Sequence, residues 1–290
     1  MHFSIHYTTE YHYSAPVSDN LNALRVRPAT TANQRCDEFH VRIDPESRLG
    51  RHSDYFGTEV IEFGISKPHS SLMIDVRARV VTAEPSTPPD PVWEELSSPA
   101  YLEAAGEYLL ASIAEPPARA LDEFNHLADA PSPLRSALHL CELIPDRFAY
   151  RRGITYVGST VADLLDIGAG VCQDFVHLAL ILLRRGGIAS RYVSGYLFAA
   201  SSDGGDDSVE VDTHAWLEVL LPSSAGRGEP VWVGLDPTNR VVAGERYVKI
   251  GHGRHYDDVP PIKGVYRGGP AELSAHVVMT RLDPATTARA

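Results

Sequence analysis

Residues 168–196, GAGVCQDFVHLALILLRRGGIASRYVSGY, set the organisation of the chain. The apolar residues after Cys172 recur with the spacing of one buried helix face: Phe175, Leu178, Ala179 and Leu182. A glycine-containing turn before Cys172 and the glycine pair 186–187 mark the two ends of that helix, and residues 188–197 continue as a β-rich segment. A thiol at a helix N-terminus faces unpaired backbone N–H groups, which favour the thiolate. The position suits a nucleophile, and a buried structural thiol is the competing interpretation.

Composition limits the class of protein and its partners. The chain has 290 residues, enough for two domains, and a net charge of −12, which argues against nonspecific binding to nucleic acid or anionic membranes. No apolar run approaches the ~18 residues of a membrane span, and the first residues lack the pattern of a secretory signal. The three cysteines form no CxxC pair and no disulfide framework. We therefore expect a cytoplasmic protein without nucleic-acid or membrane partners, and the sequence does not indicate its oligomeric state.

The pattern of apolar residues divides the chain into two parts. Residues 1–83 alternate apolar and polar side chains in short segments, which predicts an antiparallel β-sandwich. Residues 84–100 are rich in proline and are the predicted linker. Residues 101–290 begin with helical spacing at 101–113, 118–127 and 133–143, where Ser132 and Pro133 are the expected N-cap and first helical residue. A short helix at 160–165 and strands at 210–220, 230–236 and 275–282 complete a predicted α+β fold.

A cysteine nucleophile needs an imidazole to take its proton and a third group to orient that imidazole. His177 lies five residues along the same helix, about 140° around it from Cys172, and is a poor candidate. If residues 221–229 close a hairpin that pairs Leu220 with Pro230, His214 lies directly opposite Asp236. Opposed residues share a face with Cβ atoms roughly 4.5–5.5 Å apart, whereas a slip of one residue would separate them.

The predicted catalytic residues are therefore Cys172, His214 and Asp236. The backbone N–H of Cys172 is one candidate donor for an oxyanion hole, and Gln173 and Tyr156 are open alternatives for the second. Arg191 and Tyr196 could line the same cleft. Asp174 is expected to offset the helix dipole, and Trp216 and Trp232 to pack in the core. Cys141 lies among leucines of a predicted helix, and Cys36 has no base near it in the sequence.

Three segments together resemble the core of the transglutaminase-like superfamily, whose fold is papain-like. They are residues 170–196, residues 212–222 (DTHAWLEVLLP) and residues 232–240 (WVGLDPTNR). The tail at 251–269 (GHGRHYDDVPPIKGVYRGG) and the first 80 residues resemble the parts that accompany this core in bacterial members. The chain departs from these relatives at Arg254-His255-Tyr256, where Gly-Arg-Asp-Tyr is usual, and at Thr58, where asparagine is usual. By matching positions the resemblance implies Cys172 as nucleophile, His214 as base and Asp236 as its orienter.

The resemblance implies acyl chemistry on an amide of a protein or peptide through a thioester, and it leaves open whether water or an amine accepts the acyl group. A noncatalytic protein-binding module on the same scaffold is the alternative. No cofactor or metal is predicted. Three acidic or histidine-rich groups resemble metal sites, but loop or strand structure explains each of them better: His2, His6 and His12; Asp203, Asp206, Asp207 and Glu210; and His252 and His255 with Asp257 and Asp258. The glycines of residues 167–173 lack the third glycine of a dinucleotide-binding turn.

Overall fold

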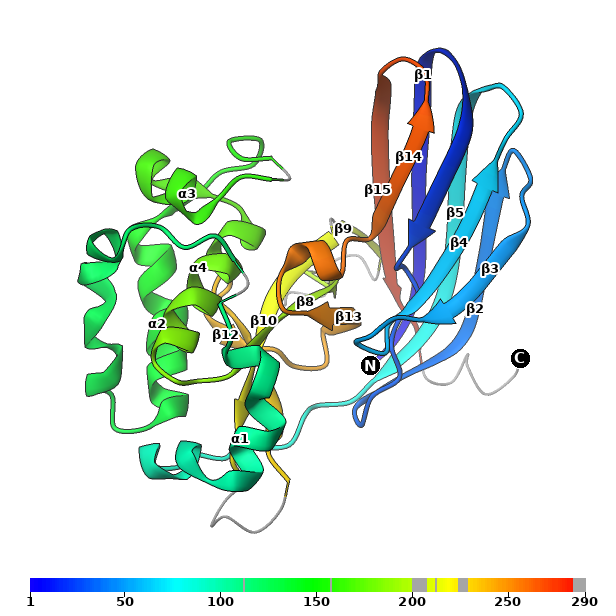
Figure 1. Cartoon of the computed structure of the whole chain (residues 1–290). Helices are drawn as coiled ribbons and strands as arrows, with labels where there is room; N and C mark the ends of the chain where they lie inside the picture. Colours follow the sequence, from blue (N-terminus) through cyan, green and yellow to red (C-terminus); the bar gives the residue numbers. More distant parts are fainter. Residues whose placement is uncertain (112, 157, 200–207, 212, 224–228, 284–290) are drawn as a thin grey trace.

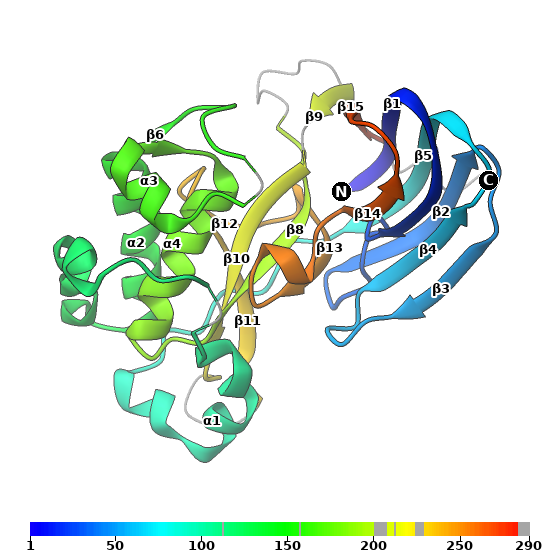
Figure 2. The same ribbon diagram turned by 45° about the horizontal axis from the view of Figure 1, so that its top comes forward.

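The computed structural model describes residues 1–111, 113–156, 158–199, 208–211, 213–223 and 229–283. These residues form an antiparallel, curled β-sheet and a second part in which helices cover a five-stranded sheet (Figure 1). The predicted α+β class is confirmed, and the arrangement of the two parts is clear in both ribbon views (Figures 1 and 2).

The N-terminal sheet is built around one long strand, β1 (His2–Leu24). The first half of β1 pairs with β5 (His69–Thr82) and β15 (Ala271–Arg281), and its second half pairs with β4 (Glu59–Ile65) and β14 (Ile262–Arg267). The remaining strands of this sheet are β2 (Gln34–Asp44), β3 (Leu49–Ser53) and β9 (Ser208–Val211). Burial alternates along β1 and β5, which is the reason for the alternating sequence pattern.

Strands from the end of the chain complete this sheet. Residues 262–281 pair with β1, and β9 pairs with β15. The boundary predicted at 101–290 therefore does not coincide with the strand pairing, because local sequence patterns cannot show which distant strand a segment will join. The predicted linker is also partly structured, with a 3₁₀ turn η1 (Trp93–Ser97) and the start of helix α1 (Pro99–Ala105).

The second part contains the sheet β12-β11-β10-β8-β13. Its strands are β8 (Ser190–Leu197), β10 (Thr213–Leu221), β11 (Val231–Asp236), β12 (Val241–Val242) and β13 (Tyr247–Gly253). Helix α4 (Cys172–Arg185) packs on β8 and β10 in the same apolar core as helix α2 (Pro133–Arg147). A two-stranded parallel sheet, β6 (Ala149–Tyr150) with β7 (Ala169–Gly170), lies just before α4 in the fold.

The helices follow the predicted signals to different extents. In α2 the Ser132 hydroxyl accepts a hydrogen bond from the Arg135 N–H at 3.2 Å, and Pro133 is the first helical residue, as predicted. Helix α3 (Val161–Ile167) is capped by Thr160. In place of one helix over 101–113, the chain forms α1, which ends at Ala105, and the short 3₁₀ helix η2 (Gly106–Leu109), since Gly106 ends the α-helix. Residues predicted as a helix at 118–127 form the 3₁₀ segment η3 (Ala118–Asp129).

The two parts share an apolar interface. Tyr196, Val248 and Ile250 of the five-stranded sheet are buried in the core of the N-terminal sheet. The Phe3 and Phe198 rings lie 5.1 Å apart between centroids across this contact. The packing fixes β13 and the end of β8 against β1.

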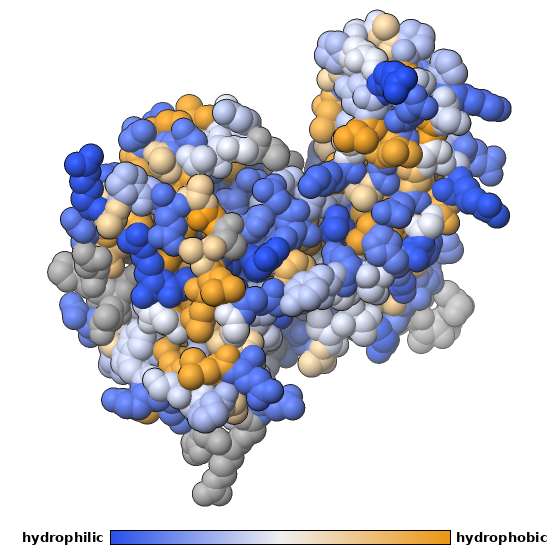
Figure 3. Space-filling view, in the orientation of Figure 1, coloured by the Kyte–Doolittle hydropathy of each residue, from blue (hydrophilic) through white to orange (hydrophobic). Residues whose placement is uncertain are grey.

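The outer surface of the N-terminal sheet carries apolar side chains near β14 (Figure 3), where Leu21 and its strand partner Val265 are both exposed. No helix among the described residues is both long enough and apolar enough to cross a membrane.

Candidate active site

Cys172 is the first residue of α4, at the helix N-terminus as predicted. The turn before it is held by Asp174, whose Oδ2 accepts hydrogen bonds from the Val171 N–H at 2.8 Å and the Thr155 hydroxyl at 2.7 Å. A Cβ at Gly170 would lie 2.7 Å from the same oxygen, so only glycine allows this approach. Asp174 thus caps the helix through hydrogen bonds, and with Gly170 it fixes the place of the thiol.

His214 and Asp236 meet across β10 and β11, although not in the predicted register. The strands pair Leu221 with Val231 and Leu217 with Leu235, so the true register differs from the predicted one by two residues. Pro230, which was predicted to pair with Leu220, has no N–H to contribute to the ladder, and pairing begins at Val231. A shift of two keeps every side chain on its face. The His214 Nε2 lies 2.7 Å from the Asp236 Oδ2, on a diagonal between the strands.

Asp236 is fully buried and accepts five hydrogen bonds. Its Oδ1 accepts from the backbone N–H groups of Thr238 and Asn239 at 2.8 and 3.2 Å. Its Oδ2 accepts from His214, from the Asn239 Nδ2 at 2.6 Å and from the Tyr247 hydroxyl at 2.7 Å. Burial raises the pKa of this carboxyl, but the hydrogen bonds from His214, Asn239 and Tyr247 outweigh burial and lower it. Asp236 is therefore a fixed anion beside the imidazole.

The imidazole of His214 is held in its charged form. Burial lowers the pKa of His214, whereas hydrogen bonds to Asp236 and to the Cys172 thiol raise it to a net value of about 9. The three residues predicted from the sequence are thus brought together, with the imidazole bonded to the carboxylate at 2.7 Å and the Cys172 thiol near enough to raise the pKa of the imidazole. This arrangement stabilises an imidazolium beside the Cys172 sulfur.

The other two cysteines lie in different surroundings. Cys141 is buried inside α2, and burial raises the pKa of its thiol far above the ordinary value. Burial also raises the pKa of the Cys36 thiol, although Arg27 partly counteracts this effect. Neither has an imidazole as hydrogen-bond partner among the residues that the structure describes.

Two residues near the site were missed by sequence reasoning. Asn239 follows Asp236 by three residues, a spacing in which an aspartate commonly accepts from the backbone just after it, so a turn signal was present. Tyr247 comes from β13, on the other edge of the sheet, and no local pattern marks it. Its ring lies 6.2 Å from the His214 ring and 5.3 Å from the Trp216 ring. Trp216 is buried, as predicted, and packs against these rings.

Arg191 and Tyr196 do not line the cleft. Arg191 forms an ion pair with Glu218 at 2.6 Å, and its guanidinium lies 3.8 Å from the centre of the Trp232 ring. Tyr196 is buried against the N-terminal sheet. Tyr156 is 77% exposed, and its backbone N–H donates to Ser159, whereas Gln173 lies beside Cys172 and lines a small cavity with His177.

No group of three or more potential metal ligands occurs among the described residues. His6 bonds to Asp75 at 2.6 Å, the His252 Nε2 accepts from Arg191 at 3.0 Å, and His255 accepts from the Asp257 N–H. Asp203, Asp206 and Asp207 lie outside the described residues, and Glu210 bonds to His276 at 2.9 Å.

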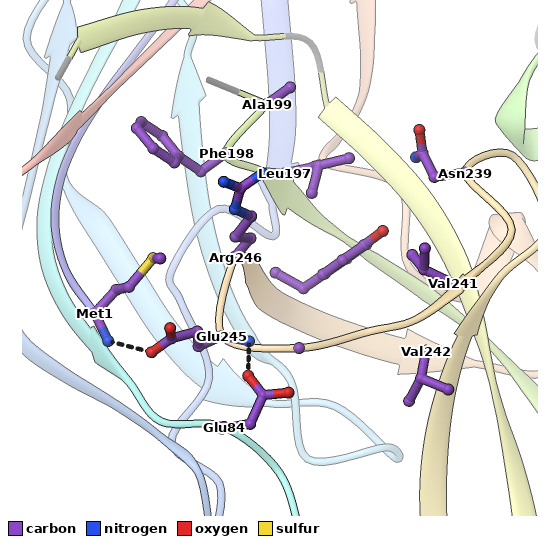
Figure 4. A pocket seen from close by; sticks show the side chains of 12 residues that line it. Met1, Glu84, Leu197, Phe198, Ala199, Asn239, Val241, Val242, Glu245 and Arg246 are labelled. Carbon is purple, nitrogen blue, oxygen red and sulfur yellow. Dashed lines mark hydrogen bonds and ion pairs between the residues drawn. The ribbon is translucent and has the colours of Figure 1, made fainter. Parts of the chain in front are cut away.

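Two cavities lie near the site. The larger, about 520 Å³, is lined by Asn239 and Tyr247, the two side chains that donate to Asp236 together with His214. Figure 4 shows Asn239, Val241 and Val242 on one side of it, with Met1, Glu84 and Glu245 on the other. The smaller cavity, about 150 Å³, runs along α4 beside Gln173 and His177.

A thiol at a helix N-terminus, an imidazole and a buried carboxylate lie together on a helix-covered antiparallel sheet, as expected for a transglutaminase-like core. Residues 3–81 match the bacterial transglutaminase-like N-terminal region, and residues 124–237 match the transglutaminase-like superfamily. The chain therefore belongs to the bacterial transglutaminase-like family, and this membership supports cysteine-based catalysis at the level of the family.

Relatives match over most of the chain. An uncharacterized protein of Mycobacterium leprae is 34% identical over 280 residues, which cover 95% of this chain and 97% of that protein. A protein-glutamine gamma-glutamyltransferase of Pseudomonas aeruginosa is 30% identical over 165 residues, 53% of this chain but 24% of that protein. A crystal structure from Cytophaga hutchinsonii, described as a candidate cysteine protease, has a TM-score of 0.74 at 22% identity and covers 98% of this chain and 91% of that one. This last similarity defines the fold.

Proposed function

We propose that the protein cleaves or transfers an amide acyl group through a thioester on Cys172, with His214 as acid and base and Asp236 as its orienter. The observation that carries the proposal is that the His214 ring is hydrogen-bonded to the buried Asp236 carboxylate at 2.7 Å and lies close enough to the Cys172 thiol for that thiol to raise its pKa. The family and the similarity to a gamma-glutamyltransferase support this class of reaction.

In the first half of the reaction the Cys172 sulfur bonds to the amide carbon. The carbon–nitrogen bond then breaks, and His214 gives its proton to the departing amine, which leaves a thioester and a neutral imidazole. In the second half water or another amine adds to the thioester, His214 takes its proton, and the carbon–sulfur bond breaks to restore the thiolate. Asp236 keeps the same imidazole nitrogen bonded throughout.

The substrate proposed here is a protein or peptide, and the proposed compartment is the cytoplasm. The net charge of −12 supports a partner other than nucleic acid or an anionic membrane. Release of the thioester to water would make the protein a peptidase or amidase, and release to an amine would make it an acyltransferase.

The first test compares the three thiols. We expect iodoacetamide near pH 7 to alkylate Cys172 in preference to Cys36 and Cys141, and His214→Ala to slow that alkylation at least tenfold, because the imidazolium that stabilises the thiolate is lost. Mass spectrometry of the tryptic peptides measures each rate. Equal labelling of all three cysteines in the unfolded protein, run as a control, calibrates peptide detection.

Equal labelling in the folded protein would contradict an activated thiol and favour a noncatalytic binding module.

The second test incubates the protein with glutaminyl peptides, with and without a primary amine. Ammonia release alone would indicate hydrolysis, and amine incorporation would indicate transfer. Cys172→Ala is expected to abolish both, and Cys36→Ala to leave both unchanged.

A further inference from the structure

Tyr247 connects the His214–Asp236 pair to the far edge of the sheet. β11, which carries Asp236, and β13, which begins at Tyr247, are separated by β10 and β8 in the strand order. The Tyr247 hydroxyl nevertheless reaches Asp236 Oδ2 at 2.7 Å, and its ring packs on His214. Burial and the negative charge of Asp236 raise the pKa of Tyr247 far above its usual value, so the hydroxyl keeps its proton and always donates.

The N-terminal sheet holds the segment that carries this tyrosine. We name residues 244–249 the docking segment. The buried Gln34 of β2 accepts from the Lys249 N–H and donates to the Lys249 carbonyl, both at 2.7 Å. The Thr82 hydroxyl at the end of β5 donates to the Glu245 carbonyl at 2.6 Å, and the Glu84 carboxylate accepts from the Glu245 N–H at 3.2 Å. Hydrogen bonds from the first 84 residues therefore fix the backbone on both sides of Tyr247.

Apolar packing adds to these hydrogen bonds. Val248 follows Tyr247 directly, is fully buried and belongs to the core of the N-terminal sheet with Phe3 and Ile5. The larger cavity lies in the same place, since Met1 and Glu84 line one side of it and Asn239 the other (Figure 4), and Tyr247 is also part of its lining. The backbone of the docking segment is thus held on its outer side by the N-terminal sheet, and Tyr247 extends from it to Asp236.

We propose that Tyr247 is a positioning residue for the His214–Asp236 pair, and that the N-terminal sheet acts on the active site by holding the docking segment in place through Gln34 and Thr82. This inference rests on the proposed function, because it assigns the N-terminal sheet a part in the same site. Tyr247 aligns the Asp236 carboxylate with the His214 imidazole, and the N-terminal sheet fixes the position of Tyr247 at the start of β13.

The test measures the protonation of His214 rather than turnover. The titratable groups that face its ring among the described residues are Cys172 from α4, Asp236 from β11 and Tyr247 from β13. NMR of ¹³C-labelled histidine rings gives the pH at which His214 loses its proton, with His214→Gln identifying its signal. Tyr247→Phe is expected to lower that midpoint by about one pH unit, because a loosened Asp236 bonds less well to the imidazole.

Tyr101→Phe is the matched control, since the Tyr101 hydroxyl accepts from the Ala189 N–H at 2.8 Å, away from the site. We expect it to leave the His214 midpoint unchanged. An unchanged midpoint in Tyr247→Phe would overturn the positioning role. So would a raised midpoint, which would mean that the hydroxyl only withdraws charge from Asp236.

The second part of the test changes residues of the N-terminal sheet and measures the same His214 midpoint. Gln34→Leu keeps the size of the side chain and removes its bonds to Lys249, and we expect a shift in the same direction of about half the size. Asn20→Leu is the control, because Asn20 bonds to Tyr13 and His69 elsewhere in the same sheet. Equal shifts in both variants would overturn the proposal, because they would indicate general destabilisation of the sheet.

Thr82→Val replaces Gln34→Leu if that variant does not fold, and the same direction is expected. The outcome is separable from the failure of the proposed function. If iodoacetamide does not prefer Cys172 in the unaltered protein, the proposed chemistry fails. If Cys172 is preferred but Gln34→Leu and Thr82→Val leave His214 unchanged, only the role of the N-terminal sheet fails.

Discussion

The five-stranded sheet carries two buried polar clusters, and each contains a histidine and a carboxylate. In the first, the anion Asp236 bonds to His214, and the pKa of His214 rises to about 9. In the second, Glu218 already bonds to two cations, Arg191 at 2.6 Å and Lys249 at 2.7 Å. Burial, Lys249 and Arg191 lower the pKa of His252 there to about 3, although Glu218 is near.

The difference shows that a nearby carboxylate does not by itself charge a buried histidine. The Arg191 guanidinium donates to the His252 Nε2, which requires a neutral imidazole. Asp236 instead has neutral donors besides His214, namely Asn239, Tyr247 and backbone N–H groups. The imidazole is therefore the group at Asp236 that can supply a compensating positive charge, whereas two cations already supply it at Glu218.

The largest effect is expected from the first cluster. Asp236→Asn offers one oxygen where the carboxylate offers two, so donors now at 2.6–3.2 Å lose their acceptor and His214 loses its anion. We expect turnover of a glutaminyl peptide to fall by roughly 10³–10⁴-fold, measured as kcat. Asp75→Asn is the control, because Asp75 bonds to His6 at 2.6 Å without a thiol nearby, and it should retain full turnover. Residual activity within tenfold of the unaltered protein would refute the orienting role.

The second cluster should affect stability instead of turnover. Glu218→Gln leaves Arg191 and Lys249 largely buried without an anion, since their side chains are each 11% exposed. We expect the free energy of unfolding to fall by about 3–5 kcal/mol, measured by urea denaturation. Glu38→Gln, which removes an exposed ion pair with Arg79, should cost less than about 1 kcal/mol. If Glu218→Gln also lowers the free energy of unfolding by less than about 1 kcal/mol, Arg191 and Lys249 must find other partners in the variant.

A smaller effect concerns pH. The folded pKa of His252, about 3, lies below the unfolded value of about 6.5, so the unfolded chain binds more protons between these values. Acidification from pH 7 to pH 5 should therefore reduce stability by about 2 kcal/mol through His252 alone. The opposite sign holds for His214, whose stabilisation is complete below pH 6.5 and is lost as pH rises through about 9.

His252→Gln is expected to flatten the acid side of the stability curve, because the glutamine does not titrate and its amide oxygen still accepts from Arg191. Denaturation at several pH values measures the slope. His12→Gln, at an exposed position on β1, should retain the slope of the unaltered protein. Identical slopes in both variants would assign the acid sensitivity to another group, of which His177, with a pKa lowered to about 4 by burial, is the first to examine.

The same contrast explains how far the site could be predicted from the sequence. The place of Cys172 was predictable because local residues determine where a helix begins: Gly170, Asp174 and the apolar face after them. The meeting of His214 and Asp236 was predicted on the correct face but in a register two residues away, because the first pair of a hairpin depends on Pro230 and on the loop before it. Cys141 was correctly placed in the core by its leucine neighbours.

Other features have no local signal. Tyr247 reaches Asp236 only because β13, which lies far beyond the thiol in the chain, joins the sheet beside β8. Arg191 lies close to Cys172 in the sequence, but in the structure it forms a buried ion pair with Glu218 of β10. The segment at 275–282 alternates apolar and polar side chains, but neither it nor residues 262–267 carry a sequence signal for a partner at the start of the chain.

The sequence by itself determined the elements and the reactive group: the alternating strands, the helix that begins at Cys172, and the face shared by His214 and Asp236. These follow from interactions among residues close in the chain, whose periods and caps can be read directly. Only the tertiary structure decided which carboxylate raises the pKa of its neighbouring histidine, and which tyrosine donates a hydrogen bond to that carboxylate. The reason is physical, because the pKa of a buried group depends on every charge and donor that surrounds it, and in this protein those come from distant strands.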